Sequence, residues 1–305
     1  MTNDKTSHQT QQALSALPSF ASFSQFKVLA SLVTAALLTL GLSACGGGTS
    51  STGSGSTPPA APTTMTPGAY MGTKVTVDGT EISKDWVSMI LPTSPASSGN
   101  AQFYALHYNA ADPDIYSGTG QVVGKSSATI SSLLLYPKNA TAARTGTGSL
   151  SSPSSGVVRA ELNFAASTLA AKTISLDHSA PSGYTAATPA TLSAVQGTWQ
   201  GLWSYGVGSA DNYSISVSAQ GMVSSSAAFQ NDCQITQSAL TPNFDGTNLY
   251  GFTLTIPNAT QCALKNQTLT GAAFVTPSPV AGKTQRLYLV GVAPDGRGIS
   301  FKADR

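Results

Sequence analysis

Hydrophobic and polar residues alternate with a period of two along much of the chain, which is the pattern of half-buried β-strands. Tyr213, Ile215 and Val217 alternate with serines, and residues 250–256 alternate large apolar side chains with Gly and Thr. The same pattern predicts further strands at residues 69–77, 85–91, 101–108, 116–124, 128–136, 156–164, 169–176, 197–204, 222–228, 268–275, 284–292 and 298–302. Turn residues separate these runs at the spacing typical of β-sandwiches and β-barrels. The sequence therefore predicts an all-β protein.

A short motif occurs twice, at the head of each set of predicted strands. Residues 68–72 (GAYMG) and 197–201 (GTWQG) share the pattern G-x-aromatic-x-G. We therefore predict two antiparallel β-barrel or β-sandwich units that arose by duplication, β domain 1 at residues 67–187 and β domain 2 at residues 188–305. The alternative is a chance match of a short motif, with one sheet shared by both halves.

Local signals between the predicted strands indicate one short helix and several turns. Thr188 is the expected N-cap, Pro189 would occupy the first helical position, and Gly197 would end the run. Dipeptides of the type Asp-Gly, such as Asp78-Gly79, are natural hairpin turns.

Composition and charge exclude several classes of partner. Charged residues make up 9% of the chain, against roughly 25% in an average soluble protein, and the formal net charge is +2. A nearly neutral chain without a basic cluster argues against nucleic acid as a partner. It also argues against electrostatic docking onto anionic lipid.

The N-terminal region has the features of an export signal. Residues 28–42 carry no charge and follow Lys27; as a helix they would span roughly 22 Å, less than the roughly 30 Å hydrocarbon core of a membrane. The run Leu42-Ser43-Ala44-Cys45 resembles the lipobox of bacterial lipoproteins. The resemblance implies cleavage before Cys45, attachment of palmitate-type acyl chains to that cysteine, and anchoring in a membrane. A transmembrane anchor or an ordinary cleaved signal is the alternative.

The segment around the expected cleavage site completes this interpretation. Residues 1–44 would be a lipoprotein signal peptide, and residues 45–66 would be the lipidated Cys45 followed by a flexible tether rich in Gly, Ser, Thr and Pro. Gly46, in the position after the lipidated cysteine, favours the outer membrane over retention in the inner membrane. The body would then face the periplasm or the cell surface.

Three cysteines occur in the chain, and lipid on Cys45 leaves two. Beyond the inner membrane the compartment is oxidising, so Cys233 and Cys262 are expected to form a disulfide. A reactive or metal-binding pair is disfavoured, because there is no C-x-x-C spacing and no histidine next to either cysteine.

The second half of the chain also resembles a family of uncharacterised proteobacterial outer-membrane lipoproteins that carry G-x-[WY]-x-G β modules. The residues that carry this resemblance are the 197–201 motif, YSISVSAQG at 213–221, Cys233, TPNFDGTNLY at 241–250, Cys262 and the closing run from Arg286 to Arg305. The resemblance implies a location and a fold. It implies no activity and no catalytic residues.

Candidate catalytic and metal-binding residues are few. No G-x-S-x-G motif occurs, and after Cys45 the histidines are His107 and His178. A Ser–His–Asp site would need one of these two, and an exposed or locally bonded histidine is the favoured alternative for both. Asp112, Asp114 and Ser117 could offer oxygens to Ca²⁺, but they lack the further carboxylates and the glycine of a calcium loop. We therefore expect no catalytic residue, no metal site and no cofactor.

Tryptophans provide the candidate ligand-facing positions. Trp199 and Trp203 lie four residues apart, thus on one face of a strand, and could line a barrel mouth. Trp86 is a third candidate for a stacking surface. Packing in the core is the favoured alternative for all three.

These observations predict a non-enzymatic, lipid-anchored envelope lipoprotein that acts by binding or as an envelope component. An inhibitor of host lysozyme or protease is the first alternative. A hydrolase with an unrecognised site, using His107 or His178, is the second.

Overall fold

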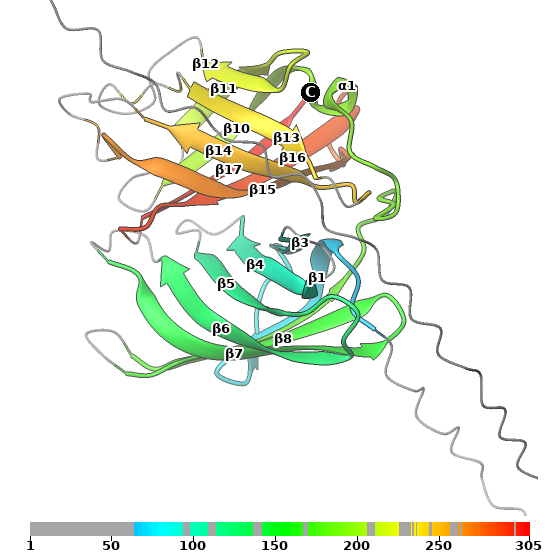
Figure 1. Ribbon diagram of the computed structural model, residues 1–305, viewed down its shortest axis with the longest axis vertical. Helices are drawn as coiled ribbons and strands as arrows, with labels where there is room; N and C mark the ends of the chain where they lie inside the picture. The colour runs from blue at the N-terminus through cyan, green and yellow to red at the C-terminus, as the bar shows by residue number, and fades with distance from the viewer. Residues whose placement is uncertain are drawn as a thin grey trace, which may run out of the picture. The chain divides into compact units, whose positions relative to one another are not determined.

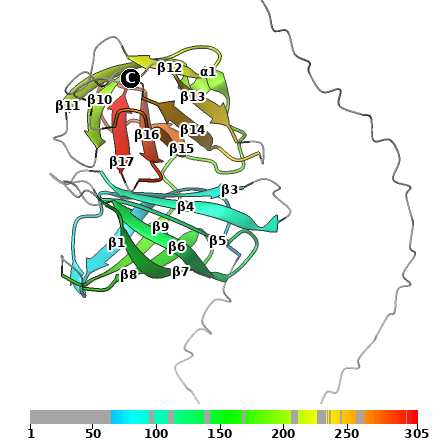
Figure 2. The same ribbon diagram turned by 60° about the vertical axis from the view of Figure 1, so that its left-hand side comes forward.

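The computed structural model of this 305-residue chain describes residues 64–93, 98–108, 114–136, 142–166, 170–205, 211–225, 233, 235, 237–243, 246–256, 262, 264–295 and 297–305. The expected signal peptide (residues 1–44), Cys45 and most of the expected tether lie outside these residues. All described residues belong to one compact unit, Thr57–Arg305. Within it the strands form two separate closed antiparallel barrels, so a single sheet shared by both halves is excluded (Figures 1 and 2).

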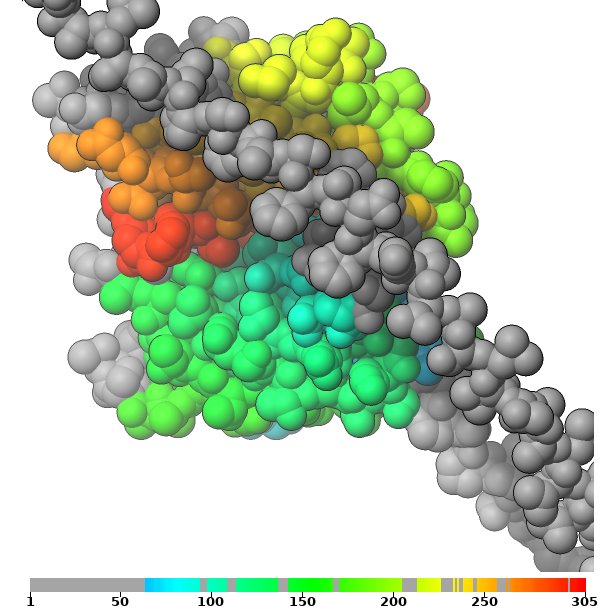
Figure 3. Space-filling view, viewed as in Figure 1, coloured from blue at the N-terminus to red at the C-terminus, as the bar shows by residue number. Residues whose placement is uncertain are grey.

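The first barrel, called barrel 1, is closed by strand β1. Its strands are β1 (Gly68–Val77), β2 (Thr80–Glu81), β3 (Trp86–Pro92), β4 (Asn100–His107), β5 (Ile115–Gln121), β6 (Ser127–Tyr136), β7 (Arg144–Ser154), β8 (Val157–Phe164) and β9 (Lys172–Ser179). Residues 68–71 of β1 pair with β3, and residues 71–77 pair with β9, which closes an eight-stranded ring. The short β2 is an addition at the end of β1. In Figure 3 the cyan-to-green atoms in the lower part of the view belong to barrel 1 and form a continuous surface on this face.

The second barrel, called barrel 2, repeats this plan. Its strands are β10 (Gly197–Tyr205), β11 (Asp211–Val217), β12 (Met222–Ser225), β13 (Gln237–Pro242), β14 (Tyr250–Thr255), β15 (Thr268–Pro277), β16 (Gln285–Val292) and β17 (Gly298–Asp304). Here β10 pairs with β11 on one side and with β17 on the other. The strand β10 therefore has the closing role that β1 has in barrel 1.

Each barrel is filled by its inward-facing side chains. Because strand side chains alternate in direction, every second residue of a strand contributes to the interior. The core of barrel 1 includes Trp86, Phe103, Tyr116, Leu162 and Phe164, and that of barrel 2 includes Trp199, Trp203, Tyr250, Phe252 and Phe301. The two cores are separate clusters.

The segment before each closing strand covers one end of its barrel. In barrel 1 the buried Met65 pairs with the turn between β5 and β6: its N–H donates to the Lys125 carbonyl (2.7 Å), and its carbonyl accepts from the Gly124 N–H (3.3 Å). In barrel 2 the short helix α1 (Leu192–Val195) precedes β10, and its last residue, Val195, is fully buried.

A third apolar cluster contains residues of both barrels. It includes Val87, Met89 and Tyr104 from barrel 1, and Phe274, Tyr288 and Val290 from barrel 2. Tyr184, in the connection, accepts a hydrogen bond from the Ala69 N–H and donates one to the Asn248 carbonyl, both at 3.1 Å. The connection is thus tied to each barrel by one side chain.

The repeated glycine motif has a steric reason. The first glycine of each motif, Gly68 and Gly197, has a positive φ, 154° and 124°, where the chain turns into its closing strand. The last glycine of the second motif, Gly201, lies so close to β17 that an added Cβ would overlap the Lys302 carbonyl. Each closing strand therefore begins at a residue whose backbone conformation favours glycine, and β10 also needs glycine at position 201 to pack against β17.

The sequence prediction of strands is largely confirmed, with specific errors. Strands β2, β7 and β13 are missing from the prediction, and β9 begins at Lys172 rather than at residue 169. In β7 the composition resembles a turn, but Gly146 is needed there because an added Cβ would lie 2.6 Å from the Phe164 ring. The predicted turn at Asp78-Gly79 is confirmed, with φ values of 49° and 79°.

The short helix is confirmed, but its predicted start is wrong. Its N-cap is Thr191 rather than Thr188, and Pro189 precedes the helix. The N–H of Ala190 donates to the Thr247 carbonyl (3.0 Å), so barrel 2 holds this stretch outside the helix.

The predicted disulfide is confirmed. Cys233 and Cys262 are bonded, with Cα atoms 4.9 Å apart, across a sequence separation of 29 residues. Both cysteines are buried and belong to the core cluster of barrel 2. The bond therefore crosslinks two segments that pack against the interior of one barrel.

Candidate ligand site at the mouth of barrel 1

Three charged residues lie at the beginnings of three strands, at the end of barrel 1 opposite Met65. Asp114 immediately precedes β5, Arg144 begins β7 and Lys172 begins β9. They line a pocket of about 330 Å³ together with Val77, Asp78, Leu135, Ala170 and Ala171. We call this pocket and its rim the mouth of barrel 1. Strands that lie far apart in the sequence meet there because the sheet closes on itself.

Lys172 and Asp114 form an ion pair that also holds a tyrosine. The Lys172 Nζ lies 2.6 Å from the Asp114 Oδ2, and the Tyr116 hydroxyl donates to the same oxygen at 2.9 Å. Lys172 also donates to the Tyr116 hydroxyl (3.3 Å). Burial of Tyr116, together with its hydrogen bond to the Asp114 carboxylate, raises the pKa of this phenol well above its usual value. Tyr116 is therefore a neutral donor at physiological pH.

Arg144 is held by backbone carbonyls rather than by a carboxylate. Its Nη2 donates to the carbonyls of Ala165 (2.8 Å) and Ala170 (3.1 Å), on the chain that leads from β8 to β9. The guanidinium carbon lies 5.9 Å from the centre of the Phe164 ring. These contacts fix the position of the Arg144 side chain, and because carbonyl groups are uncharged they do not neutralise its charge.

His107 lies near this mouth and stacks on a tryptophan. Its ring centre is 4.7 Å from that of Trp86, with an interplanar angle of 8°. Trp86 in turn contacts the Tyr116 ring, with centres 5.4 Å apart. Burial lowers the pKa of His107, while the carboxylates of Asp114 and Asp85 act in the opposite direction. Within the described part of the chain, the imidazole has no hydrogen bond to a serine or a carboxylate.

His178, the other histidine considered in the sequence, faces the interior of barrel 1. It is completely buried, and neither ring nitrogen has a hydrogen-bond partner among the described residues. Burial lowers its pKa to about 3, although the neighbouring Asp177 acts to raise it. A histidine in this position is neutral at physiological pH and is not accessible to a substrate.

The two tryptophans proposed to face a ligand fill the interior of barrel 2. Trp199 is 0% exposed and Trp203 is 1% exposed, so the structure matches the packing alternative. The Trp203 ring packs against Tyr213 and Phe301, with centres 6.0 and 5.5 Å apart. The Trp199 indole N–H donates to the Val195 carbonyl (2.8 Å).

A second hollow, of about 450 Å³, lies along barrel 2. It is lined by Gln200, Gly201, Tyr213, Ser214, Val280, Lys283 and Asp304. The Asp304 carboxylate already accepts two hydrogen bonds from Arg286, at 2.8 and 2.9 Å, and one from Ser278 at 2.6 Å. The carboxylate of this hollow is therefore already engaged by two side chains of barrel 2.

The calcium interpretation of residues 112–117 finds no support. Asp112 lies outside the described residues, Asp114 pairs with Lys172, and the Ser117 hydroxyl donates to the Tyr136 hydroxyl (3.2 Å). Over the described ranges, no group of three or more His, Cys, Asp or Glu side chains is placed to hold a metal ion. No helix among the same residues has the length and apolar character needed to span a membrane.

Two main residues of the mouth, Arg144 and Lys172, had no signal in the sequence. Each is an isolated cation at the first residue of its strand, and 58 residues separate Lys172 from Asp114. Asp114 and His107 were noted, but for metal binding and for catalysis. The sequence does not show that Asp114, Arg144 and Lys172 lie on one rim, because the closed barrel is what brings them together.

Comparison with known proteins identifies no family. No family model and no curated protein match the chain. Among solved structures, the chain is similar to the crystal structure of a protein of unknown function from the DUF3598 family of Nostoc punctiforme. The match has 11% identity, covers 78% of this chain and 95% of that one, and has a TM-score of 0.24. A TM-score this low supports no conclusion about the fold or the function of this chain.

Proposed function

We propose that this protein is a lipid-anchored component of the bacterial cell envelope that acts by binding a ligand. The anchor would be the lipid on Cys45, and residues 46–66 would tether the body to the outer membrane. Two or three acyl chains hold a protein at a membrane essentially permanently, because each buried CH₂ contributes about 0.8 kcal/mol.

The observation that carries the binding role is the mouth of barrel 1. Small binding sites are concave, with apolar walls and a few fixed polar groups, and this pocket has both. The side chains of Asp114 and Lys172 are held by Tyr116, and that of Arg144 is held by backbone carbonyls, at the ends of the rigid strands of a closed barrel.

The positions of the histidines favour binding over hydrolysis. A catalytic histidine needs hydrogen-bond contact with the group that it activates. His178 is enclosed in the core, and His107 is stacked flat against Trp86. Neither arrangement resembles a nucleophile–base pair.

The anchor is tested by expressing the full chain in a Gram-negative host and separating the membranes. We expect the protein in the outer-membrane fraction, with a mass that corresponds to cleavage before Cys45 and addition of diacylglyceryl and acyl groups. The matched control is Cys45→Ser, which cannot form the thioether and should lose the added mass. An unmodified thiol at Cys45 in the wild type would contradict the proposal.

The binding role is tested by capture experiments with the full chain purified from membranes in detergent. A ligand that the wild type retains, and that a variant with an altered mouth loses, would support binding at barrel 1. Hydrolysis of a generic ester or peptide substrate that disappears in His107→Ala would instead support the enzyme alternative.

A further inference from the structure

Two cations lie over two aromatic rings that touch each other at the mouth of barrel 1. The Arg144 guanidinium lies 5.9 Å from the Phe164 ring centre, and the Lys172 ammonium lies 6.0 Å from the Tyr116 ring centre. The two ring centres are 5.9 Å apart. Because aromatic rings cannot hydrate a cation as water does, both charges are partly desolvated on this side. An anion placed above the rings would therefore interact with both cations more strongly than at an open surface.

Both cations retain hydrogen-bond donors. A guanidinium has five N–H groups, and Arg144 uses Nη2 for two carbonyls; Nε and Nη1 have no partner among the residues that the structure describes. An ammonium has three N–H groups, and Lys172 uses two, for Asp114 and Tyr116. The rim can thus donate several further charge-assisted hydrogen bonds to the oxygens of one ligand.

The rest of the pocket is suited to a small apolar body. Val77, Leu135, Ala170 and Ala171 line it beside the charged groups, and its volume of about 330 Å³ is near the lower end for ligand sites. A second carboxylate, that of Asp78, also lines the pocket, and its Oδ1 accepts a hydrogen bond from the Thr173 N–H (2.8 Å). A carboxylate on a short hydrocarbon or aromatic body matches this division between charged rim and apolar wall.

We propose that the mouth of barrel 1 binds the carboxylate of a small organic acid through Arg144 and Lys172. The apolar part of the acid packs against Leu135 and the two alanines. This assignment names the ligand class for the binding role proposed above.

The proposal also predicts whether a substitution at Asp114 raises or lowers the affinity for an organic acid. The Asp114 carboxylate forms an ion pair with Lys172 and would repel the carboxylate of a ligand nearby. Asn at this position keeps the shape and an acceptor oxygen for Tyr116, but it removes the competing charge. Asp114→Asn should therefore bind an organic acid more tightly than the wild type does. If Asp114 served only to maintain the fold of the mouth, the same substitution would weaken binding.

The test is calorimetric titration of the purified full chain with benzoate at low ionic strength, with benzamide as the neutral probe of the same shape. We expect benzoate to bind and benzamide to bind at least about tenfold more weakly, because charged hydrogen bonds distinguish the two. Arg144→Gln should weaken benzoate binding about tenfold, and Asp114→Asn should strengthen it about fivefold. Added salt should weaken binding, since the mouth is partly exposed to solvent.

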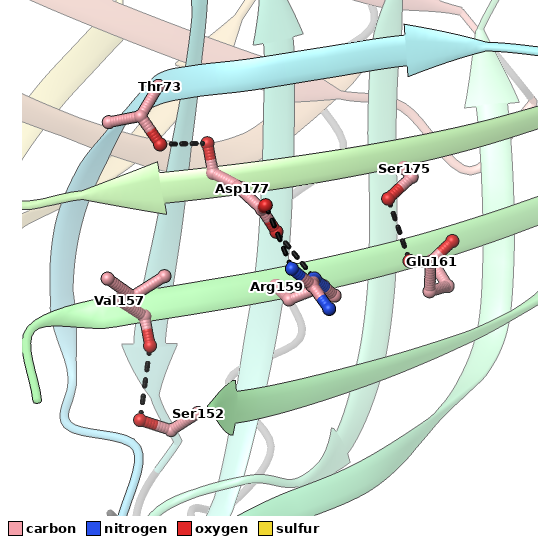
Figure 4. Close-up of polar contacts among 7 residues, drawn as sticks. All are labelled: Thr73, Ser152, Val157, Arg159, Glu161, Ser175 and Asp177. Carbon is pink, nitrogen blue, oxygen red and sulfur yellow. Dashed lines mark hydrogen bonds and ion pairs between the residues drawn. The ribbon is translucent and has the colours of Figure 1, made fainter. Parts of the chain in front are cut away.

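The matched control is Arg159→Gln, on the outer wall of the same barrel. Figure 4 shows Arg159 on β8 paired with Asp177 on β9, with two hydrogen bonds of 2.6 and 2.9 Å. This change removes one paired arginine outside the mouth and should leave benzoate binding unchanged. Thermal melts of all variants show whether they fold as the wild type does.

Equal affinity for benzoate and benzamide, or an Arg144→Gln protein that folds and binds benzoate normally, would overturn the proposal. So would the absence of benzoate binding by the wild type. None of these results affects the membrane fractionation or the mass at Cys45, so the failure of this inference is distinguishable from the failure of the anchor.

Discussion

The indole N–H of Trp199 donates a hydrogen bond to the carbonyl oxygen of Val195, four residues earlier in the chain (2.8 Å). Tyr70 has the same relationship to Thr66: its hydroxyl donates to the carbonyl four residues earlier (2.5 Å). In each case the aromatic residue of the G-x-aromatic-x-G motif lies in a barrel core and binds the segment that closes the barrel end. This shared arrangement, together with the shared closing strand, supports the duplication that the sequence motif predicts.

The hydrogen bond of Tyr70 predicts a modest loss of stability in Tyr70→Phe. The substitution removes the hydroxyl alone and leaves the Thr66 carbonyl without this donor. The free energy of unfolding should fall by about 1 kcal/mol, measured by urea denaturation. Thr66→Ser keeps both the backbone carbonyl and a hydroxyl, so it serves as the control and should be close to wild type. A Tyr70→Phe protein as stable as the wild type would show that water replaces the bond.

Arg305 predicts a larger effect at the closed end of barrel 2. Its guanidinium lies 4.5 Å from the Trp199 ring centre and donates to the carbonyls of Ala194 (2.9 Å) and Gln196, and to the Gln285 side chain (2.8 Å). Arg305→Gln should lower the free energy of unfolding by about 2 kcal/mol, because it removes the cation and most of these donors. Thermal melting followed by tryptophan fluorescence measures this change.

Arg305→Lys separates the charge from the hydrogen-bonding geometry. It keeps the cation over Trp199 but lacks the planar fork that reaches several acceptors, so its stability should lie between those of the wild type and Arg305→Gln. If the lysine and glutamine variants lose the same stability, the cation over the ring contributes nothing measurable.

The buried His178 predicts a loss of stability in acid. Its pKa is about 3 in the folded protein and about 6.5 in an unfolded chain, so between these values the unfolded chain binds a proton that the folded chain does not. Unfolding is therefore favoured as the pH falls from 6.5 towards 3, by up to about 1.4 kcal/mol per pH unit. Above pH 6.5 this contribution does not change with pH.

Urea denaturation at pH 4.5 and pH 7.5 tests this linkage. His178→Leu fills much of the same space and cannot titrate, so its stability should change less between the two pH values than that of the wild type. Equal changes in both proteins would place the acid sensitivity at other groups.

The disulfide predicts that reduction destabilises the protein. Breaking the Cys233–Cys262 bond frees a loop of about thirty residues in the unfolded chain, which corresponds to about 3.5 kcal/mol in the chain-entropy model. The Cys233→Ala/Cys262→Ala double variant, compared with the wild type with and without reductant, measures the effect. Reductant should have no effect on the double variant, which is the internal control.

The strands were predictable where apolar residues alternate, and not where glycine and serine form the sheet. Strand β11 alternates Tyr213, Ile215 and Val217 with serines, so its period is evident. In β7 the sequence RTGTGSLSSPS has a single large apolar residue, Leu150, and its strand conformation follows from pairing with neighbours on both sides. Local pattern alone does not record such tertiary pairing.

The candidate site was largely unpredictable for a related reason. The chemistry of the mouth depends on Asp114, Arg144 and Lys172, and each is separated from the next by 28 residues or more. Their side chains meet because β5, β7 and β9 begin at the same end of a closed ring. The disulfide, in contrast, followed from counting three cysteines and removing one.

Met65 makes the two ends of barrel 1 different, because it covers one end and leaves the other open. The end that Met65 covers is a full strand length away from Arg144 and Lys172 at the other end. The described residues that lead into β1 therefore leave the charged rim uncovered, and a solute can reach the mouth without displacing them.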